Sequence, residues 1–181
     1  MFKKLGIGLL GVLVGLIALI ASRPADFRLE RKTKIDAPVA VTFGLVNDFH
    51  SWDVWSPWAK IDPAMKVTHS GPERGQGAVY EWTGNSEVGQ GRMEILSARE
   101  NEEVKIDLHF IAPFEAKNLT TFTFVPQGNG VEVIWAMAGT NNFMAKAFDL
   151  FVGMEKQVGP DFEKGLAQLK QAAEQKAKAG V

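Results

Sequence analysis

Residues that could carry acid–base, metal or nucleophilic chemistry are few and widely spaced in this chain. The 181 residues include no cysteine, which excludes a thiol nucleophile, a thiolate metal site and a disulfide within the chain. His50, His69 and His109 are isolated in sequence, and no H-E-x-x-H motif occurs, so we predict no metal site. Neither a G-x-S-x-G nucleophile elbow nor a G-x-x-x-x-G-K-[ST] phosphate loop occurs. We therefore predict no cofactor and no conventional hydrolase or nucleotide-binding site.

Polar side chains at three positions could still act on a ligand. Asp48 and His50 could form an acid–base pair, although two polar residues that follow a helix are more often caps or surface groups. Tyr80, the single tyrosine, could donate a hydrogen bond to a ligand carbonyl, although a buried tyrosine is more often satisfied by the protein itself. We therefore assign no catalytic residue, and whether the chain is an enzyme stays open, with a non-catalytic protein favoured.

Three tryptophans at spacings of three form the densest aromatic group of the sequence. Trp52, Trp55 and Trp58 could meet on one turn of helix and close one end of a sheet. The alternative is a lid or cavity mouth that contacts a ligand or a membrane interface, where tryptophan is enriched. We favour the structural reading, and the functional one stays open.

The elements that would position these side chains follow from hydrophobic periodicity. Residues 27–35 alternate as a strand with one wet face, and Pro38 starts a short helix that is followed by a loop or broken helix at residues 52–63. Six further strands, divided by Gly, Pro and Asn, suggest an antiparallel meander: 65–69, 78–83, 88–96, 104–110, 122–126 and 131–137. From Phe143 the period becomes helical, with a kink or restart expected at Gly159-Pro160.

The charge balance argues against a nucleic-acid partner. Twenty Lys and Arg residues offset 21 Asp and Glu residues, so no global field would gather a strongly charged ligand. The length suits about one domain that can bury a substantial core. We therefore expect one α+β domain over residues 26–181, and the sequence does not predict its oligomeric state.

An uncharged, apolar run distinguishes the first 25 residues from the rest of the chain. Residues 5–22 contain no charged side chain, and a helix of that length would cover about 27 Å, close to the roughly 30 Å of a bilayer core. The alternative is a cleaved signal peptide, but Leu19 and Ile20 disfavour a small-x-small cleavage site. We expect residues 1–25 to form a single-pass membrane anchor. The basic flanks compete for orientation, and we favour export of the domain to the periplasmic or extracellular side.

Motifs along the domain resemble the polyketide cyclase/dehydrase-like branch of the START-like (SRPBCC) superfamily. They cover essentially residues 27–172 and comprise Ile35-x-Ala37-Pro38, Trp52-x-x-Trp55-Ser56-Pro57-Trp58, Gly75-x-Gly77, Tyr80-x-Trp82-x-Gly84-Asn85, Gly89-x-Gly91-Arg92-Met93 and Phe162-x-x-Gly165-Leu166-x-x-Leu169. The resemblance implies a helix-grip fold, in which a curved antiparallel β-sheet wraps around a long C-terminal helix and leaves a cavity. Members bind lipids, sterols, polyketides or other hydrophobic molecules, and a minority are enzymes. Function must therefore be argued from the site.

Strand alternation predicts which side chains face such a cavity. Residues of one parity on each strand share a face, and the C-terminal helix would oppose them. The predicted ligand contacts are Trp55, Trp58, Tyr80, Trp82, Met93, Leu108, Phe110, Phe122, Trp135, Phe151 and Phe162. We expect membrane-tethered binding or transport of a hydrophobic small molecule or lipid. Two alternatives stay open: a lyase of the polyketide cyclase/dehydrase type, and a non-catalytic envelope interaction scaffold with a filled cavity.

Overall fold

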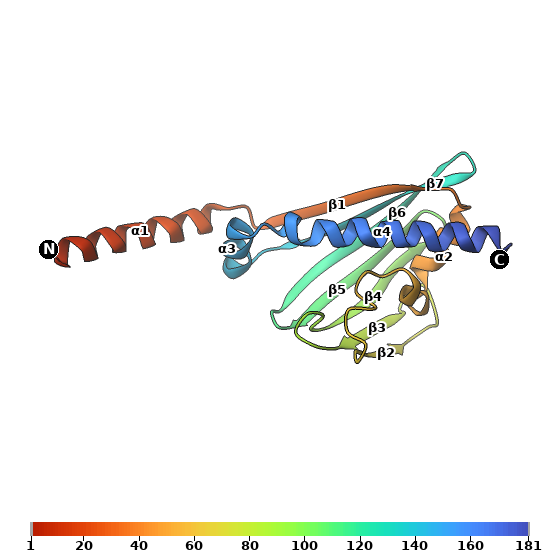
Figure 1. Cartoon of the computed structure of the whole chain (residues 1–181), viewed down its shortest axis with the longest axis horizontal. Coiled ribbons are helices and arrows are strands. Elements are labelled where there is room, and N and C mark those ends of the chain that lie inside the picture. Colours follow the sequence, from red (N-terminus) through yellow and green to blue (C-terminus); the bar gives the residue numbers. More distant parts are fainter. Residues whose placement is uncertain (1, 181) are drawn as a thin grey trace.

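The computed structural model describes residues 2–180, and it describes the side chains of residue 8 and residues 10–180. Figure 1 shows a broad sheet crossed by the long helix α4, with α1 projecting from one end of the domain. The elements in chain order are α1 (Phe2–Ser22), β1 (Asp26–Ile35), α2 (Val39–Asn47), the 3-10 helix η1 (Phe49–Val54), β2 (Lys66–Ser70), β3 (Val79–Thr83), β4 (Gln90–Arg99), β5 (Glu103–Ala112), β6 (Ala116–Gln127), β7 (Gly130–Thr140), α3 (Phe143–Phe151) and α4 (Met154–Lys178).

The seven strands form one antiparallel sheet in the order β1-β7-β6-β5-β4-β3-β2. Strands β2 to β7 are a meander in which each strand pairs with the next, and β1 pairs with β7. This arrangement confirms the six predicted meander strands and the separate first strand. The curved antiparallel sheet and the long C-terminal helix confirm the α+β, helix-grip fold class.

The short helix α2 begins where proline predicts a helix start. Pro38 is its N-cap residue, and proline suits a helix start because its ring fixes φ and it has no N–H to leave unpaired. Phe43, Leu45 and Val46 are buried, and the Phe43 ring meets Phe124 of β6 edge to face at 5.5 Å. Helix α2 therefore covers part of the sheet and fixes where the following tryptophan segment starts.

Charged contacts hold α4 against the edge strand β1 at both ends. Arg31 of β1 donates to Glu163 at 2.9 Å and to Glu155 at 3.2 Å, and the hydrogen bond to Glu163 is the main cause of its raised pKa. Toward the other end of α4, the backbone N–H of Asp36 donates to Glu174 at 3.0 Å and lowers the pKa of that carboxyl. The two Arg31 ion pairs are exposed and contribute little stability individually, but together with the Asp36 hydrogen bond they connect both ends of α4 to β1 and the residue after it.

The break in the C-terminal helical region lies at Gly153. This residue has φ of 82°, a left-handed conformation that glycine adopts without a Cβ clash. The N–H of Met154, the first residue of α4, then donates to Asp149 at 2.8 Å. The restart expected at Gly159-Pro160 is therefore found earlier, and α4 continues through Pro160.

The N-terminal helix α1 packs against α3, and Ile20 is buried there. The expected anchor at residues 5–22 includes four side chains, those of residues 5–7 and 9, that lie outside the described part. Among the described residues we find no helix that is both long and apolar enough to cross a membrane.

Candidate functional site

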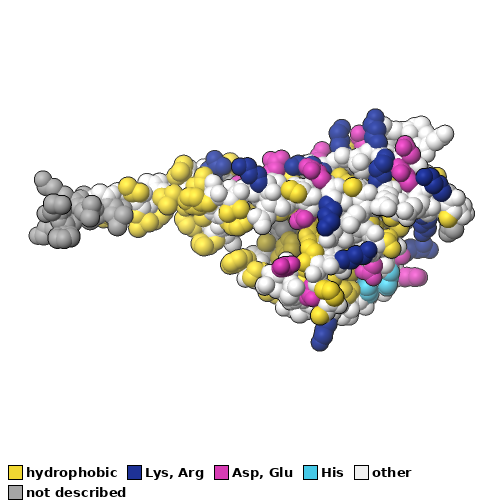
Figure 2. Space-filling model, in the orientation of Figure 1, with side chains coloured by type: hydrophobic (Ala, Val, Ile, Leu, Met, Phe, Trp, Pro, Cys, Tyr) yellow, Lys and Arg dark blue, Asp and Glu magenta, His cyan; other side chains and the backbone are white. Residues whose placement is uncertain are grey.

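A cavity lies between the sheet and the two C-terminal helices. Its volume is about 370 Å³, within the roughly 300–1,000 Å³ of small-molecule pockets. Strands β3 to β7 line one side, α3 and α4 line the other, and the segment that carries the tryptophans closes part of the rim. Most of its wall is apolar, and Figure 2 shows a hollow lined by hydrophobic side chains beneath α4.

Strand register arranges the sheet wall in rows. Tyr80, Met93, Leu108 and Asn118 are successive cross-strand partners on β3, β4, β5 and β6. Partners in register project from the same face, and all four line the cavity. The strand alternation seen in the sequence is thus what places these side chains side by side.

The neighbouring row depends on a glycine. Trp82, Gly91 and Phe110 are successive partners, and a Cβ added to Gly91 would collide with the Trp82 indole ring. The ring therefore lies over the β4 backbone, where it meets Phe110 edge to face at 5.8 Å. The Trp82 indole N–H donates to the Val88 carbonyl at 2.9 Å, which fixes the ring as part of the cavity wall.

An aromatic stack connects the sheet to α4 at the inner end of the cavity. Trp135 of β7 stacks on Phe162 of α4 at 4.1 Å and on Phe122 of β6 at 4.8 Å. Trp58 meets both Trp135 and Phe162 edge to face. Such pairs stabilise beyond the area they bury, so this end of the space between sheet and helix is filled.

Eight of the eleven predicted ligand contacts line the cavity. Their contact with a ligand stays a prediction. They are Trp58, Tyr80, Trp82, Met93, Leu108, Phe110, Trp135 and Phe162.

The other three predicted contacts lie outside the cavity lining. Trp55 and Phe122 are 1% and 0% exposed and belong to the packed core behind the wall. Phe122 has the predicted parity on β6, but Trp135 covers it. Phe151 is 68% exposed at the end of α3, because the chain breaks at Gly153 before α4 begins.

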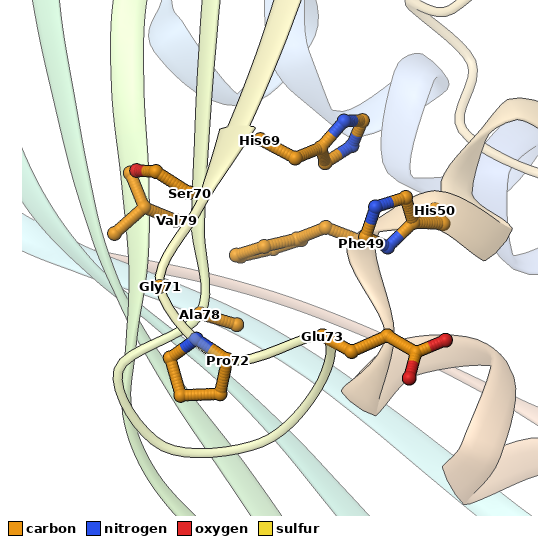
Figure 3. A pocket seen from close by; sticks show the side chains of 9 residues that line it. All are labelled: Phe49, His50, His69, Ser70, Gly71, Pro72, Glu73, Ala78 and Val79. Carbon is orange, nitrogen blue, oxygen red and sulfur yellow. The ribbon is translucent and has the colours of Figure 1, made fainter.

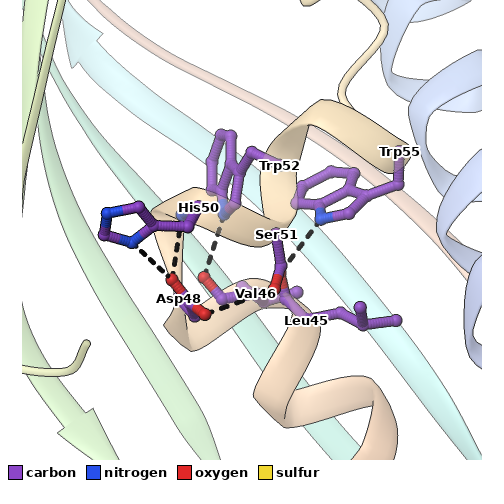
Figure 4. Close-up of polar contacts among 7 residues, drawn as sticks. All are labelled: Leu45, Val46, Asp48, His50, Ser51, Trp52 and Trp55. Carbon is purple, nitrogen blue, oxygen red and sulfur yellow. Dashed lines mark hydrogen bonds and ion pairs between the residues drawn. The ribbon is translucent and has the colours of Figure 1, made fainter. Parts of the chain in front are cut away.

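The tryptophan segment is held by hydrogen bonds to the end of α2 (Figure 4). The indole N–H groups of Trp52 and Trp55 donate to the carbonyls of Val46 and Leu45, each at 3.0 Å. Helix ends leave carbonyls without intrahelical partners, and these two indoles satisfy such groups. The structural role favoured from sequence is confirmed for both residues, although Trp52 also lines the cavity, and Trp58 lines it too.

Several lining residues were not predicted from sequence. Asn118 and Thr120 of β6 are buried on the wall, and they share the parity of Phe122, so placing the strand start at Ala116 would have found them. The α3 residues Ala145 and Phe148 carry no equivalent signal, because helical periodicity does not show which face meets a cavity. The two β6 residues supply neutral hydrogen-bonding groups on the sheet side of a mostly apolar wall, which also carries the carboxylates of Glu87, Glu115 and Asp161.

Tyr80 is a hydrogen-bond donor rather than a base. Burial, with a smaller effect of the Asp53 charge, raises the pKa of its hydroxyl to about 12. The ring packs against Phe49 at 5.9 Å and against His69 at 5.3 Å. A phenol in this setting stays protonated at neutral pH.

His50 and His69 line a separate pocket beside the edge strand β2, together with Phe49 and the loop that follows β2 (Figure 3). His50 and His69 stack at 4.1 Å, and burial, followed by the neighbouring His50, lowers the pKa of His69. Asp48 accepts from both the backbone N–H and the ring of His50 and is the N-cap of η1. Within the described residues, no group of three metal-binding side chains occurs. Asp48 thus has the capping role favoured from sequence.

Solved structures with this fold span a range of proteins. Protein CV1439 from Chromobacterium violaceum is 16% identical, with a TM-score of 0.58 over 84% of this chain and 99% of that chain. Protein SA2116 from Staphylococcus aureus, described as of unknown function, is 11% identical, with a TM-score of 0.60 over 81% and 95%. The di-domain ARO/CYC protein StfQ from the steffimycin biosynthetic pathway is 13% identical, with a TM-score of 0.64 over 87% of this chain and 53% of its own. At these identities the likeness establishes the fold alone.

Family-level comparison goes further than these structures. No curated protein sequence matches the chain. The family model described as polyketide cyclase / dehydrase and lipid transport matches residues 26–174, which are the residues that form the sheet, the cavity and most of α4. This match confirms the resemblance inferred from the motifs. The chain therefore belongs to the polyketide cyclase / dehydrase and lipid transport family.

Proposed function

We propose that this protein binds a hydrophobic small molecule or lipid in the cavity between the sheet and the C-terminal helices. The observation that carries the proposal is a cavity of about 370 Å³ whose wall is mostly apolar, with polar side chains at a minority of its lining positions. Apolar walls supply affinity by removing ligand surface from water, and a few polar groups fix the ligand's orientation. Asn118, Thr120 and the Tyr80 hydroxyl are suited to orient a carbonyl or hydroxyl of the ligand.

The sheet wall of the cavity supplies no evident catalytic base, while the carboxylates of Glu87, Glu115 and Asp161 also line the cavity and keep the lyase alternative open. A lyase needs an acid or base in contact with the substrate and with a pKa near the working pH. Tyr80 has its pKa raised to about 12 by burial, which leaves it a poor base at neutral pH. Asn118 and Thr120 are neutral, and neither can take up a proton from a substrate. We therefore assign no catalytic role to these wall residues.

A cavity-filling substitution tests the binding function. Ala145 and Ala147 are both partly exposed on α3, but only Ala145 lines the cavity. We expect Ala145→Trp to weaken binding of a fluorescent fatty-acid probe at least tenfold, because the indole would occupy ligand space. Ala147→Trp is the matched control and should bind the probe as wild type does. Equal affinity in all three proteins, or no probe binding by wild type, would refute the cavity as the binding site.

We also propose that residues 1–25 tether the domain to a membrane as a single-pass anchor. Residues 5–22 carry no charge, and α1 is helical from Phe2 to Ser22. Exposed apolar side chains on this helix include Leu10, Val12 and Leu13, at 61%, 71% and 52%. A helix with so much exposed apolar surface is stable in lipid and costly in water.

Membrane extraction and a reporter test the tether and its orientation. The full chain should resist alkaline extraction from membranes, and a variant with charges introduced at Leu10 and Leu13 should be released. A phosphatase reporter that is active only after export, fused to the C-terminus, should be active, because we expect the domain on the periplasmic or extracellular side. Release of the full chain would rule out the tether, and an inactive reporter would reverse the orientation.

A further inference from the structure

Helix α3 exposes an apolar face that the domain does not cover. None of its nine residues is buried, whereas α2 and α4 each bury several side chains. Scattered exposed apolar residues are ordinary, but a contiguous group on one short helix marks an interaction surface. We define the α3 face by the exposed side chains of the helix and of its C-cap residue Val152: Phe143, Met144, Phe148, Phe151 and Val152, which are 44%, 70%, 46%, 68% and 44% exposed.

The α3 face adjoins the cavity. Helix α3 is a regular helix whose N-cap, Asn142, accepts from the Ala145 N–H at 2.9 Å, so its exposure does not reflect an unformed segment. Ala145 and Phe148 belong to the cavity lining, and Phe148 is also part of the α3 face. Figure 2 shows hydrophobic side chains continuing from α1 onto the adjoining part of the domain, next to the hollow.

Backbone contacts hold α3 close to the end of α1. The Asn141 N–H donates to the Ala25 carbonyl at 2.8 Å, immediately before α3. Ala25 is three residues after Ser22, where α1 ends, and three residues span at most about 11 Å. The Lys146 ammonium of α3 also reaches the Ala21 carbonyl at 3.5 Å. Wherever α1 leaves a bilayer, α3 must lie within roughly one helix diameter of that point.

We propose that the α3 face docks on the surface of the bilayer that holds α1, so that the cavity opens toward membrane lipid. This inference rests on the proposed membrane tether. The occupant is a lipid surface because the face continues the apolar surface of α1. Helix α3 has only two charged residues: Lys146 bonds to Ala21, and Asp149 accepts from Met154. Docking is therefore driven by apolar burial and does not require anionic lipid.

Site-specific labelling of the full chain tests directly whether the α3 face contacts the bilayer. The chain lacks cysteine, so a single introduced cysteine can carry an environment-sensitive fluorophore. Met144→Cys and Phe151→Cys report on the α3 face. Val125→Cys, also on an exposed apolar residue, is the matched control. Asn118 of β6 pairs with Gly139 near the α1 end of the sheet. Val125 lies seven residues further along β6, so it is about 23 Å from Asn118 along the strand.

In phosphatidylcholine proteoliposomes, labels at positions 144 and 151 should show blue-shifted emission and quenching by nitroxide-labelled lipid, while position 125 should resemble water. Quenching at 144 and 151 no greater than at 125 overturns the proposal. Self-quenching between labelled chains without lipid quenching overturns it in favour of a second copy as the occupant. If the chain binds the fatty-acid probe but shows no lipid quenching, the proposed cavity function is supported and the proposed docking is contradicted. Lipid quenching without probe binding supports docking and removes the cavity function.

A charge variant supplies the functional readout. The double variant Met144→Glu with Phe151→Glu places two carboxylates on exposed positions of the α3 face, so the core is untouched. We expect it to exchange a fluorescent lipid with phosphatidylcholine vesicles at least tenfold more slowly than wild type, with unchanged probe affinity in detergent. Val125→Glu should exchange at the wild-type rate. Exchange by the double variant at the wild-type rate contradicts the role of the α3 face.

Discussion

At the scale of single residues, two phenylalanines on the concave side of the sheet have different environments. Phe110 is partly exposed in the cavity, whereas Phe122 is fully buried beneath Trp135. Truncating a packed phenylalanine removes its burial and leaves a new void, which costs about 3–5 kcal/mol. At Phe110 the space beside the ring already exists, so the loss should be smaller.

We predict that Phe122→Ala lowers the free energy of unfolding by about 3–5 kcal/mol and that Phe110→Ala lowers it by less than about 3 kcal/mol. Phe110→Ala should also change the affinity for the fatty-acid probe, because it enlarges the cavity. Urea denaturation and probe titration of the two variants provide the measurements. Equal destabilisation of both variants, with unaltered probe binding by Phe110→Ala, would mean that Phe110 is ordinary core.

Tyr80 provides a pH-dependent test of wall burial. Its pKa is raised from 10.0 to about 12, chiefly by burial, so the folded protein holds this proton more tightly than the unfolded chain does. The contribution to stability is fully present below about pH 10 and is lost as the pH rises toward 12. Because the chain has one tyrosine, tyrosinate absorbance follows this residue alone. A folded protein that titrates near pH 10 would show that the hydroxyl is solvated.

At the scale of elements, glycines determine how closely α4 approaches the sheet. A Cβ added to Gly165 would lie 2.7 Å from the Trp135 ring and 3.0 Å from Pro57. Six residues earlier on the same helix, a Cβ at Gly159 would lie 2.6 Å from the guanidinium end of the Arg31 side chain. That flexible end can move aside. A methyl group at position 165 would therefore meet packed rings that cannot move easily, whereas one at position 159 would meet a flexible side chain.

We predict that Gly165→Ala destabilises the protein by about 1–3 kcal/mol, as overpacking does. Gly159→Ala should stay within about 1 kcal/mol of wild type, since the gain in helix propensity offsets the displacement of Arg31. Thermal unfolding of both variants gives the comparison. A Gly165→Ala protein as stable as Gly159→Ala would show that α4 does not pack tightly on Trp135.

Sequence periodicity predicted the strands well because each one has a wet face and a dry face. The row from Tyr80 to Leu108 follows directly from that alternation. Periodicity could not show that Trp135 would cover Phe122, because the parity of a strand residue assigns its face of the sheet but not how deeply it is packed. Nor could it place Phe151, since the helical pattern continues through Gly153, where the backbone turns.

At the scale of the whole molecule, three features lie toward one end of the fold. Helix α1 joins the domain there, α3 is held to the linker after α1 by the bond from Asn141 to Ala25, and α3 forms part of the cavity lining. The opposite end of the space between sheet and helix is filled by the stack of Phe122, Trp135 and Phe162. A ligand would therefore enter from the α1 end, which is the end that the proposed membrane tether would hold next to lipid.

The most direct test of the central claim is native mass spectrometry of the full chain purified in mild detergent, followed by extraction and identification of any retained molecule. We predict a hydrophobic small molecule or lipid retained at about one per chain by wild type and by the Ala147→Trp control. The Ala145→Trp variant should lose it. A wild-type chain that carries no such molecule and takes up none when lipid is added, or an Ala145→Trp chain that retains it equally, would contradict binding in this cavity.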